Sequence, residues 1–186
     1  MINLFTRIIA FILLFLLLPV ILFITLTIFF ESGKPIFFRQ QRVGKNNLNF
    51  TLIKFRTMTV NTPDLATNLI KNPDQYITRV GKILRTTSLD ELPQLINIIK
   101  GDMNFVGPRP ALHNQENLIK LRTQKGINSL KPGITGWAQV NGRDNLSSKE
   151  KVRFDNYYLK NKSFFLNMKI IFMTIFKIFI FKDVRH

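Results

Sequence analysis

Residues 8–30, IIAFILLFLLLPVILFITLTIFF, contain no charged side chain. As a continuous helix this run would be about 35 Å long, which is enough to cross a hydrocarbon core of roughly 30 Å. It is too long for the core of a signal peptide, and the ESGKP sequence after it offers no small-residue cleavage site. We therefore expect residues 1–30 to form a membrane-embedded helix that stays in the mature protein.

Pro19 divides this run into two halves, each of which would cross only about half of a hydrocarbon core as a helix. Because proline removes a backbone donor and bends a helix, a re-entrant hairpin broken at Pro19 is one prediction. Arg7 precedes the run and Lys34 follows it, so the positive-inside tendency would keep both ends on the cytoplasmic side. A straight single-pass anchor with a tolerated proline is the alternative.

The composition limits the chemistry that the chain can perform. The 186 residues include 27 Lys and Arg against 11 Asp and Glu, a formal charge of +16, which points to an anionic partner. There is no cysteine, so disulfides, thiolate nucleophiles and cysteine metal sites are excluded. With only two histidines, far apart in the sequence, catalysis must depend mainly on carboxylates, Lys, Arg and hydroxyl groups.

Residues 31–162 are predicted to form a compact, mainly helical α+β body on the cytoplasmic side. Turn-forming residues at 44–47 separate two short runs rich in β-branched and aromatic residues, a pattern typical of a β-hairpin. Residues 92–100 have a helical apolar pattern that ends at Gly101. Further helices are expected over residues 114–125 and 148–160.

The C-terminal segment, residues 163–186, is largely apolar but is interrupted by Lys169 and Lys177. On a helical wheel these lysines lie on the same side as the other polar residues. This pattern favours an amphipathic helix in the membrane interface, with its lysines toward the headgroups. A second membrane span is the alternative, which two central lysines make costly.

The stretch TSLDELPQL, residues 87–95, places two carboxylates side by side in a chain with few acids. One interpretation is structural, because Ser88 and Glu91 fit a capping box and acids suit the first turn of a helix. Pro93 would then be the fifth helical residue, where it breaks a hydrogen bond. A helix that starts at Asp90 would instead place Pro93 in the first turn, where it is tolerated.

A catalytic role for Asp90 and Glu91 is the other interpretation. Cations surround the pair in sequence, including Arg85 just before it and Arg109 after the helix. A carboxylate near several cations stays ionised and can act as a nucleophile or as a metal ligand. Mg²⁺ is commonly held by one or two carboxylates together with substrate phosphates, and arginine binds phosphate through bidentate geometry. These features indicate phosphoryl chemistry on a lipid.

Four segments resemble a known family, in this order along the chain: KFRTM (54–58), TSLDELPQLINIIKGDMNFVGPRP (87–110), KPGITGWAQVNGRD (131–144) and FDNYY (154–158). Together they closely resemble the bacterial sugar transferases, and specifically the small monotopic phosphoglycosyl transferases. The resemblance extends over nearly the whole chain.

This resemblance implies transfer of a sugar 1-phosphate from a UDP-sugar to polyprenyl (undecaprenyl) phosphate with release of UMP. It also implies a location in the bacterial inner membrane, with the active site on the cytoplasmic face, and a role in the first membrane step of a surface glycan pathway. The partners would be the two substrates and membrane lipid, with a homodimer left open. The sequence does not disclose which sugar is transferred.

By the same resemblance, Asp90 would attack the β-phosphate and form a covalent phosphosugar enzyme, and Glu91 would be the Mg²⁺ ligand. Arg109 and Arg85 would hold the diphosphate, and Lys54 would line the same pocket.

Arg143 and Asp155 match further polar, substrate-binding positions of the family. The chain departs from the family at Leu18, where a serine is common before the membrane proline, and at Ala10, where an acid is common. Both departures concern the break in the membrane helix and leave the catalytic assignment intact.

Two other functions agree with part of the sequence. The high positive charge would suit a nucleic-acid-binding protein, but the long apolar run and the lack of a nucleic-acid-binding motif argue against it. A catalytically silent membrane scaffold would not need Asp90, Glu91 and Arg109. We therefore predict an enzyme with no nucleic-acid partner.

Overall fold

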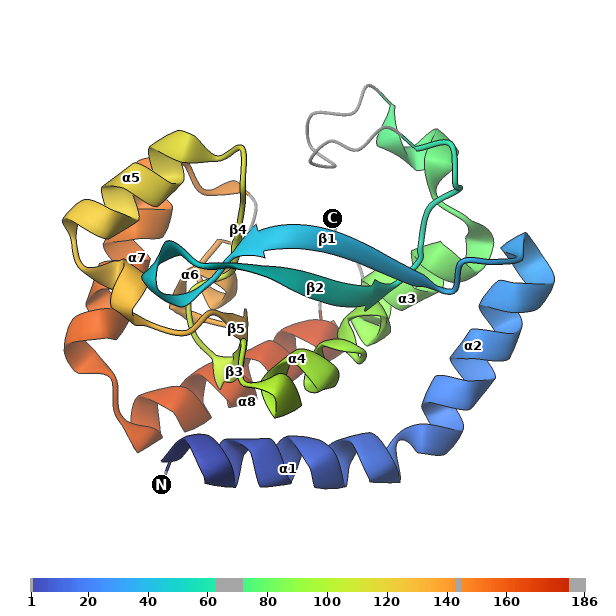
Figure 1. Cartoon of the computed structure of the whole chain (residues 1–186), viewed down its shortest axis with the longest axis horizontal. Helices are drawn as coiled ribbons and strands as arrows, with labels where there is room; N and C mark the ends of the chain where they lie inside the picture. The colour runs from blue at the N-terminus through green and yellow to red at the C-terminus, as the bar shows by residue number, and fades with distance from the viewer. Residues whose placement is uncertain (1, 63–71, 143–144, 181–186) are drawn as a thin grey trace.

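The chain begins with two helices that meet at a sharp bend, α1 (Ile2–Leu16) and α2 (Leu18–Ser32). The computed structural model describes residues 2–62, 72–142 and 145–180. In Figure 1, α1 lies along one side of the body and α2 turns away from it toward the sheet. The bend between them is 60°. Pro19 lies at the start of α2, where its missing N–H costs no helical hydrogen bond, so the predicted break is present with Leu17 as its pivot.

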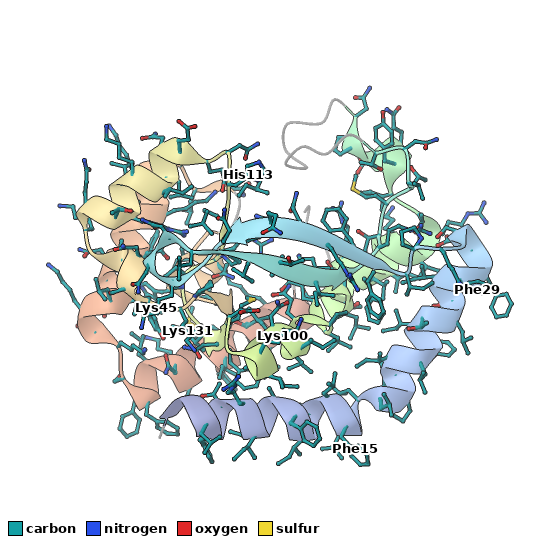
Figure 2. The ribbon with its side chains drawn as sticks, viewed as in Figure 1. Phe15, Phe29, Lys45, Lys100, His113 and Lys131 are labelled. Carbon is teal, nitrogen blue, oxygen red and sulfur yellow. The ribbon has the colours of Figure 1, made fainter. Side chains whose placement is uncertain are left out.

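The outer surface of this helix pair is apolar. The side chain of Phe15 is 71% exposed, and Phe15 and Phe29 both point away from the body in Figure 2. None of the helices that the structure describes is long and apolar enough to cross a bilayer alone, whereas α1 and α2 pass that requirement together as a bent pair. A straight helix over residues 8–30 is therefore wrong, and the re-entrant hairpin stays a prediction.

The inner surface of α1 packs on α4 (Gln94–Lys100). Ala10 is 0% exposed and lies in a buried cluster with Leu95 and Ile98 of α4, so its small side chain lets the two helices approach closely. One turn earlier, the Arg7 guanidinium donates hydrogen bonds to the carbonyls of Ile99, at 2.6 Å, and Lys100, at 2.7 Å. These carbonyls lie at the end of α4, where they have no intrahelical partner.

A second arginine holds the end of α2. Arg56 follows the first hairpin and is buried, and its Nη2 atom lies 2.8 Å from the Ser32 carbonyl and 2.9 Å from the Gly33 carbonyl. The same nitrogen contacts the Ser32 hydroxyl at 2.7 Å. Arg7 and Arg56 therefore attach the apolar helix pair to the body at both ends.

The predicted β-hairpin is confirmed, with strands β1 (Phe37–Val43) and β2 (Asn49–Phe55) paired antiparallel from Phe37↔Phe55 to Val43↔Asn49. Asn46 and Asn47 adopt positive φ in the turn η1 (Lys45–Asn47), as asparagine tolerates. The short strand β4 (Ala111–Leu112) joins the other edge of β1.

A second, two-stranded sheet pairs β3 (Asn104–Val106) with β5 (Gly133–Thr135) in parallel. Before the C-terminal helix, the other helical elements of the described residues are η3 (Pro73–Tyr76), α3 (Arg79–Thr87), η4 (Leu89–Glu91), α5 (Glu116–Gln124), η5 (Ile127–Ser129), α6 (Trp137–Val140) and α7 (Ser148–Asn161). The helices predicted within 92–100, 114–125 and 148–160 are therefore confirmed as α4, α5 and α7. The sequence patterns did not identify α3 or α6. The described chain as a whole is mostly helical, with two small sheets in the body.

The last described helix, α8 (Phe164–Ile180), has one buried side and one exposed apolar side. Ile170 is 0% exposed against the body, whereas Phe165 is 83% exposed. The Lys169 ammonium lies 5.6 Å from the centre of the Trp137 ring, so this lysine contacts the body as a cation over an aromatic face. This helix alone does not meet the length and composition of a membrane span. Its place in the membrane interface stays a prediction.

Replacing Arg56 by lysine should lower the thermal unfolding temperature of the detergent-solubilised protein. All of the Arg56 contacts with Ser32 and Gly33 come from Nη2, at the far end of the guanidinium. A lysine side chain is one bond shorter, so its ammonium would not reach the same position and buried carbonyls at the end of α2 would lose their donor. We expect a loss of about 2 kcal/mol, or on the order of 5 °C. Arg39→Lys, at an exposed position of the same hairpin, is the matched control. Equal unfolding temperatures for the two variants would contradict this role of Arg56.

Candidate active site

The two adjacent acids lie in η4, a short 3-10 turn between α3 and α4. Ser88 ends α3 in the left-handed conformation, with φ 57°, and its side chain makes no capping hydrogen bond. The capping-box interpretation of Ser88 and Glu91 is therefore wrong, as is a helix that starts at Asp90. Pro93 is the N-cap residue of α4, so the acids precede that helix and are not its first turn.

Both acids are buried and face cations from distant parts of the chain. Asp90 is 7% exposed and Glu91 is 8% exposed. The Lys54 ammonium, from β2, lies 2.7 Å from Glu91 Oε1 and 3.7 Å from Asp90 Oδ2. Arg109, from the loop between β3 and β4, places its Nη1 atom 3.4 Å from Glu91 Oε1. The predicted site residues Lys54, Asp90, Glu91 and Arg109 are thus brought together by the fold.

The environment of Asp90 disfavours the charged form of its carboxyl group, and one carboxyl oxygen is available to react. Burial raises the pKa of its carboxyl, and the neighbouring charge of Glu91 raises it further, whereas Lys54 in particular opposes the shift. Its Oδ1 atom is buried and has no hydrogen-bond partner among the described residues. A buried carboxylate oxygen without a partner is poorly stabilised and free to react with an electrophile.

Arg85, in the last turn of α3, lies close to the Asp90 carboxylate. Its Nη2 atom is 3.6 Å from Met58 Sδ. Burial lowers the pKa of Arg85, and the negative charge of Asp90 opposes that shift. The position of α3 depends on Gly81, because a Cβ there would lie 2.1 Å from the Thr57 carbonyl oxygen. This close packing brings Arg85 to the site.

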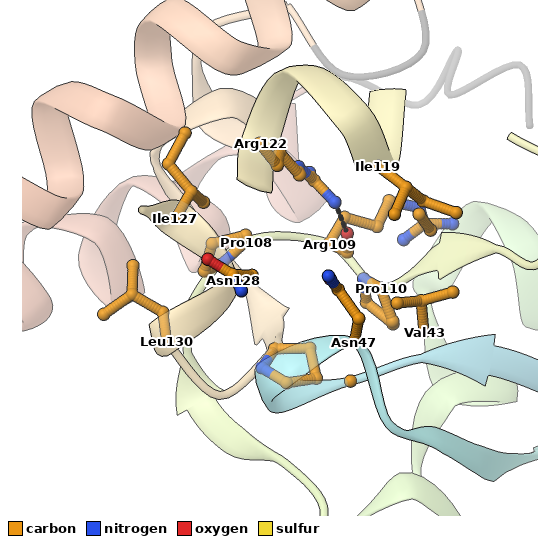
Figure 3. A pocket seen from close by; sticks show the side chains of 13 residues that line it. Val43, Asn47, Pro108, Arg109, Pro110, Ile119, Arg122, Ile127, Asn128 and Leu130 are labelled. Carbon is orange, nitrogen blue, oxygen red and sulfur yellow. Dashed lines mark hydrogen bonds between the residues drawn. The ribbon is translucent and has the colours of Figure 1, made fainter. Parts of the chain in front are cut away.

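Asp155 is connected to the candidate active site through Arg122. It is 1% exposed, and its Oδ2 atom accepts hydrogen bonds from Arg122 Nε at 3.0 Å and Nη2 at 2.7 Å. Arg122 in turn donates from Nη1 to the carbonyl of Arg109 at 2.9 Å, drawn as a dashed line in Figure 3. Burial raises the pKa of Asp155, and the charge of Arg122 opposes that shift. A direct contact of Asp155 with substrate stays a prediction.

Arg122 was missed by the sequence reasoning. It lies four residues after Leu118 on α5, and both side chains are buried. A basic residue on the apolar stripe of a helix is the signal that could have identified it, because a buried guanidinium requires a buried partner. Arg143, also predicted to bind substrate, lies outside the described residues.

A small pocket lies behind Arg109, between the turn of the first hairpin and the segment after α5 (Figure 3). Its volume is about 30 Å³, so it has room only for groups the size of a water molecule. Asp90 and Glu91 do not line it. The pocket therefore borders the site without being the place where a nucleotide would react.

The donor set of the site suits a hard cation that is shared with a substrate. Within the described residues, no three His, Asp or Glu side chains gather in a way that could hold a metal by themselves. Asp90 and Glu91 supply carboxylate oxygens, of which Asp90 Oδ1 is buried without a hydrogen-bond partner in the described structure. Mg²⁺ commonly takes one or two such carboxylates and completes its shell with phosphate oxygens and water. The residues fit that mode of binding.

The sequence matches the family described as bacterial sugar transferase over residues 1–181. It is 43% identical over 169 residues to the uncharacterized sugar transferase EpsL of Bacillus subtilis, covering 89% of this chain and 81% of EpsL. It is 40% identical over 182 residues to the UDP-glucose:undecaprenyl-phosphate glucose-1-phosphate transferase of Escherichia coli.

That alignment covers 94% of this chain but only 39% of the E. coli protein. The UDP-N-acetylgalactosamine-undecaprenyl-phosphate N-acetylgalactosaminephosphotransferase of Aeromonas hydrophila is 38% identical over 164 residues, which are 84% of this chain and 38% of that protein. The match to the family extends over all four segments singled out in the sequence and over the buried acids that the fold brings together with Lys54 and Arg109. The chain therefore belongs to the bacterial sugar transferase family.

Proposed function

We propose that the protein transfers a sugar 1-phosphate from a UDP-sugar to undecaprenyl phosphate and releases UMP. The observation that carries this proposal is the buried Asp90, whose Oδ1 atom has no hydrogen-bond partner among the described residues and which lies among the charges of Lys54, Arg85 and Arg109. The relatives from E. coli and A. hydrophila, by their names, act on UDP-sugars and undecaprenyl phosphate, which supports the same substrate classes here.

The reaction would proceed in two displacements at one phosphorus atom. Asp90 Oδ1 attacks the β-phosphorus of the UDP-sugar, forming an aspartyl–phosphate bond while the bond to the bridging oxygen breaks and UMP leaves with that electron pair. A phosphate oxygen of undecaprenyl phosphate then attacks the same phosphorus. The bond to Asp90 breaks, the carboxylate is regenerated, and the product is an undecaprenyl diphosphate sugar.

The cations around Asp90 would compensate charge that the substrate brings. Arg109 and Arg85 would bind the diphosphate oxygens, since a guanidinium matches phosphate geometry. The Lys54 ammonium lies 2.7 Å from Glu91 Oε1 and 3.7 Å from Asp90 Oδ2, so its positive charge acts on both carboxylates. Glu91 would hold Mg²⁺, which when bound supplies further positive charge to the diphosphate. Together these groups would stabilise the charge that develops on the leaving UMP.

The geometry also supports a location at a membrane surface. The acids precede α4, a helix of 7 residues and thus about 10 Å in length, and α1 packs on this helix and binds its end through Arg7. If the exposed apolar faces of α1 and α2 are embedded in lipid, Asp90 lies close to the headgroup region. A lipid-linked phosphate would reach the carboxylate there.

Asp90→Asn should abolish transfer. With Mg²⁺, undecaprenyl phosphate and a panel of UDP-sugars that includes UDP-glucose and UDP-N-acetylgalactosamine, we expect the wild type to release UMP from at least one donor. The variant should be slower by at least about 10³-fold, because an amide is a far poorer nucleophile than a carboxylate. Glu116→Gln, an exposed change of acid to amide, should retain the wild-type rate. UMP release by Asp90→Asn at the wild-type rate would contradict the proposal.

The same variant should be more stable than the wild type at neutral pH. Because the pKa of Asp90 is raised in the folded state, the wild type loses stability as the pH rises from the ordinary carboxyl value through the raised one, whereas Asn does not titrate. We expect an unfolding temperature higher by on the order of a few degrees at pH 7 and no difference in acid, where Asp90 is protonated. Thermal unfolding at both pH values measures this. A variant that is less stable at pH 7 would show that the buried charge is not a cost to folding.

Lys54→Gln should slow transfer and shift its pH dependence upward. Without the ammonium, the pKa of Asp90 rises further, so a smaller fraction of the nucleophile is ionised near pH 7. We expect a loss on the order of 10²-fold at pH 7, partly recovered at higher pH and in Lys54→Arg. Lys82→Gln, at an exposed position of α3, is the control. A uniform loss at every pH would assign Lys54 to substrate binding alone.

A further inference from the structure

A second group of cations lies outside the candidate active site. Arg7, Lys45, Lys100 and Lys131 come from four separate segments near the end of α4. Arg7 and Lys131 lie beside Gly101, Lys100 directly precedes Gly101 in the sequence, and the charge of Lys45 acts on Lys131. Figure 2 shows Lys131 and Lys100 on the side of the body toward α1, and Lys45 at the turn of the first hairpin. We refer to these four residues as the basic cluster.

The geometry of the cluster is fixed at its centre. Arg7 Nη2 and Lys131 Nζ lie 3.4 and 3.6 Å from the single point that a Cβ on Gly101 would occupy. Arg7 is held there by its two hydrogen bonds to the end of α4. Burial lowers the pKa of Lys131, the charges of Arg7 and Lys45 lower it further, and only Asp102 opposes them.

The cluster lacks matching acids. Within the described parts of the chain, the ion pairs are made by Lys54, Arg109 and Arg122, and none involves Lys45, Lys100 or Lys131. Asp102, an acid whose charge acts on Lys131, already accepts a hydrogen bond from Asn97 at 3.3 Å. Like charges brought together by a fold repel one another unless an external anion compensates them.

The position of the cluster indicates what that anion is. Arg7 of the cluster lies on the side of α1 that contacts α4. Phe5, Phe11 and Phe15 of α1 are exposed, and Phe15 points away from the body in Figure 2. A helix with apolar side chains outward in lipid places cations on its inner side at the level of the headgroups. The C-terminal end of α4 is negative by its dipole and is already neutralised by Arg7, so the remaining lysines are directed to something outside the chain.

We propose that the basic cluster binds the phosphate group of an anionic membrane phospholipid. This site is distinct from the diphosphate-binding cations around Asp90, because it uses none of Lys54, Arg85 or Arg109. It depends on the proposed membrane location but not on the transfer reaction. Its effect would be to fix the depth and orientation of α1, and through α4 those of the catalytic acids.

The test is native mass spectrometry of the full chain released from non-ionic detergent after incubation with phosphatidylglycerol, phosphatidylcholine or inorganic phosphate. The variant is Lys45→Gln with Lys131→Gln, which leaves Arg7 and its structural hydrogen bonds intact. The matched control is Lys120→Gln with Lys149→Gln, which removes two charges from exposed positions of α5 and α7. Lys45→Arg with Lys131→Arg should restore binding if charge is what matters.

We expect the wild type, the control and the arginine variant to retain one phosphatidylglycerol in preference to phosphatidylcholine. The Lys45→Gln, Lys131→Gln variant should bind it about 30-fold more weakly, because each basic side chain near an anionic surface contributes roughly a fivefold factor. Equal retention by the glutamine variant and its control would overturn the proposal. Displacement of the lipid by millimolar inorganic phosphate would assign the cluster to a soluble anion instead.

UMP release, measured on the same preparations, separates this proposal from the proposed function. A variant that loses the lipid but turns over UDP-sugar in detergent supports an independent lipid site. If the wild type binds phosphatidylglycerol selectively but is inactive with every donor, the lipid site stands and the transferase assignment fails.

Discussion

The ammonium of Lys54 lies against two adjacent buried carboxylates, and the rest of the structure is arranged around that contact. Asp90 and Glu91 are almost fully excluded from solvent, and an uncompensated pair of neighbouring buried acids would be strongly destabilising. Compensation requires cations from elsewhere in the chain. Strand β2 supplies Lys54, the loop after β3 supplies Arg109, and α3 supplies Arg85. The positions of these three elements are therefore coupled to one electrostatic requirement.

The short helix α4 connects this charged centre to the apolar helix pair. It begins directly after the acids and ends at carbonyls that Arg7 of α1 caps, while Arg56 caps the end of α2. A movement of α1 relative to the body would thus be transmitted to Asp90 through seven residues of helix. In an enzyme whose second substrate is held in a membrane, such a rigid connection would set the depth at which the nucleophile meets the lipid phosphate.

Much of the architecture followed from local sequence signals. The hairpin was predictable because asparagines tolerate the positive φ that its turn requires, and α4 because its apolar pattern ends at a glycine. The two acids of the candidate active site were singled out from a motif and from neighbouring charge. Their local conformation was not predicted, because Ser88 adopts a left-handed conformation that is uncommon for serine and that the residue order does not indicate.

The residues and helices that position the candidate active site were the hardest to predict from the sequence. Arg122 reaches Asp155 and the Arg109 carbonyl across 33 and 13 residues of sequence, contacts that exist only after α5 and α7 have packed together. Helix α3 was also missed, since its nine residues carry only a short amphipathic pattern, and its place depends on a glycine in contact with backbone. Tertiary contacts, and not propensity, decide such elements.

The most direct test of this account is intact-protein mass spectrometry of the enzyme with Mg²⁺ and a UDP-sugar, quenched in acid with undecaprenyl phosphate withheld. If Asp90 is the nucleophile, the wild type gains the mass of one sugar phosphate, which is removed when undecaprenyl phosphate is added and is absent from Asp90→Asn. A wild type that releases UMP in the presence of the lipid yet never carries the adduct, or an adduct that persists in Asp90→Asn, would contradict Asp90 as the nucleophile.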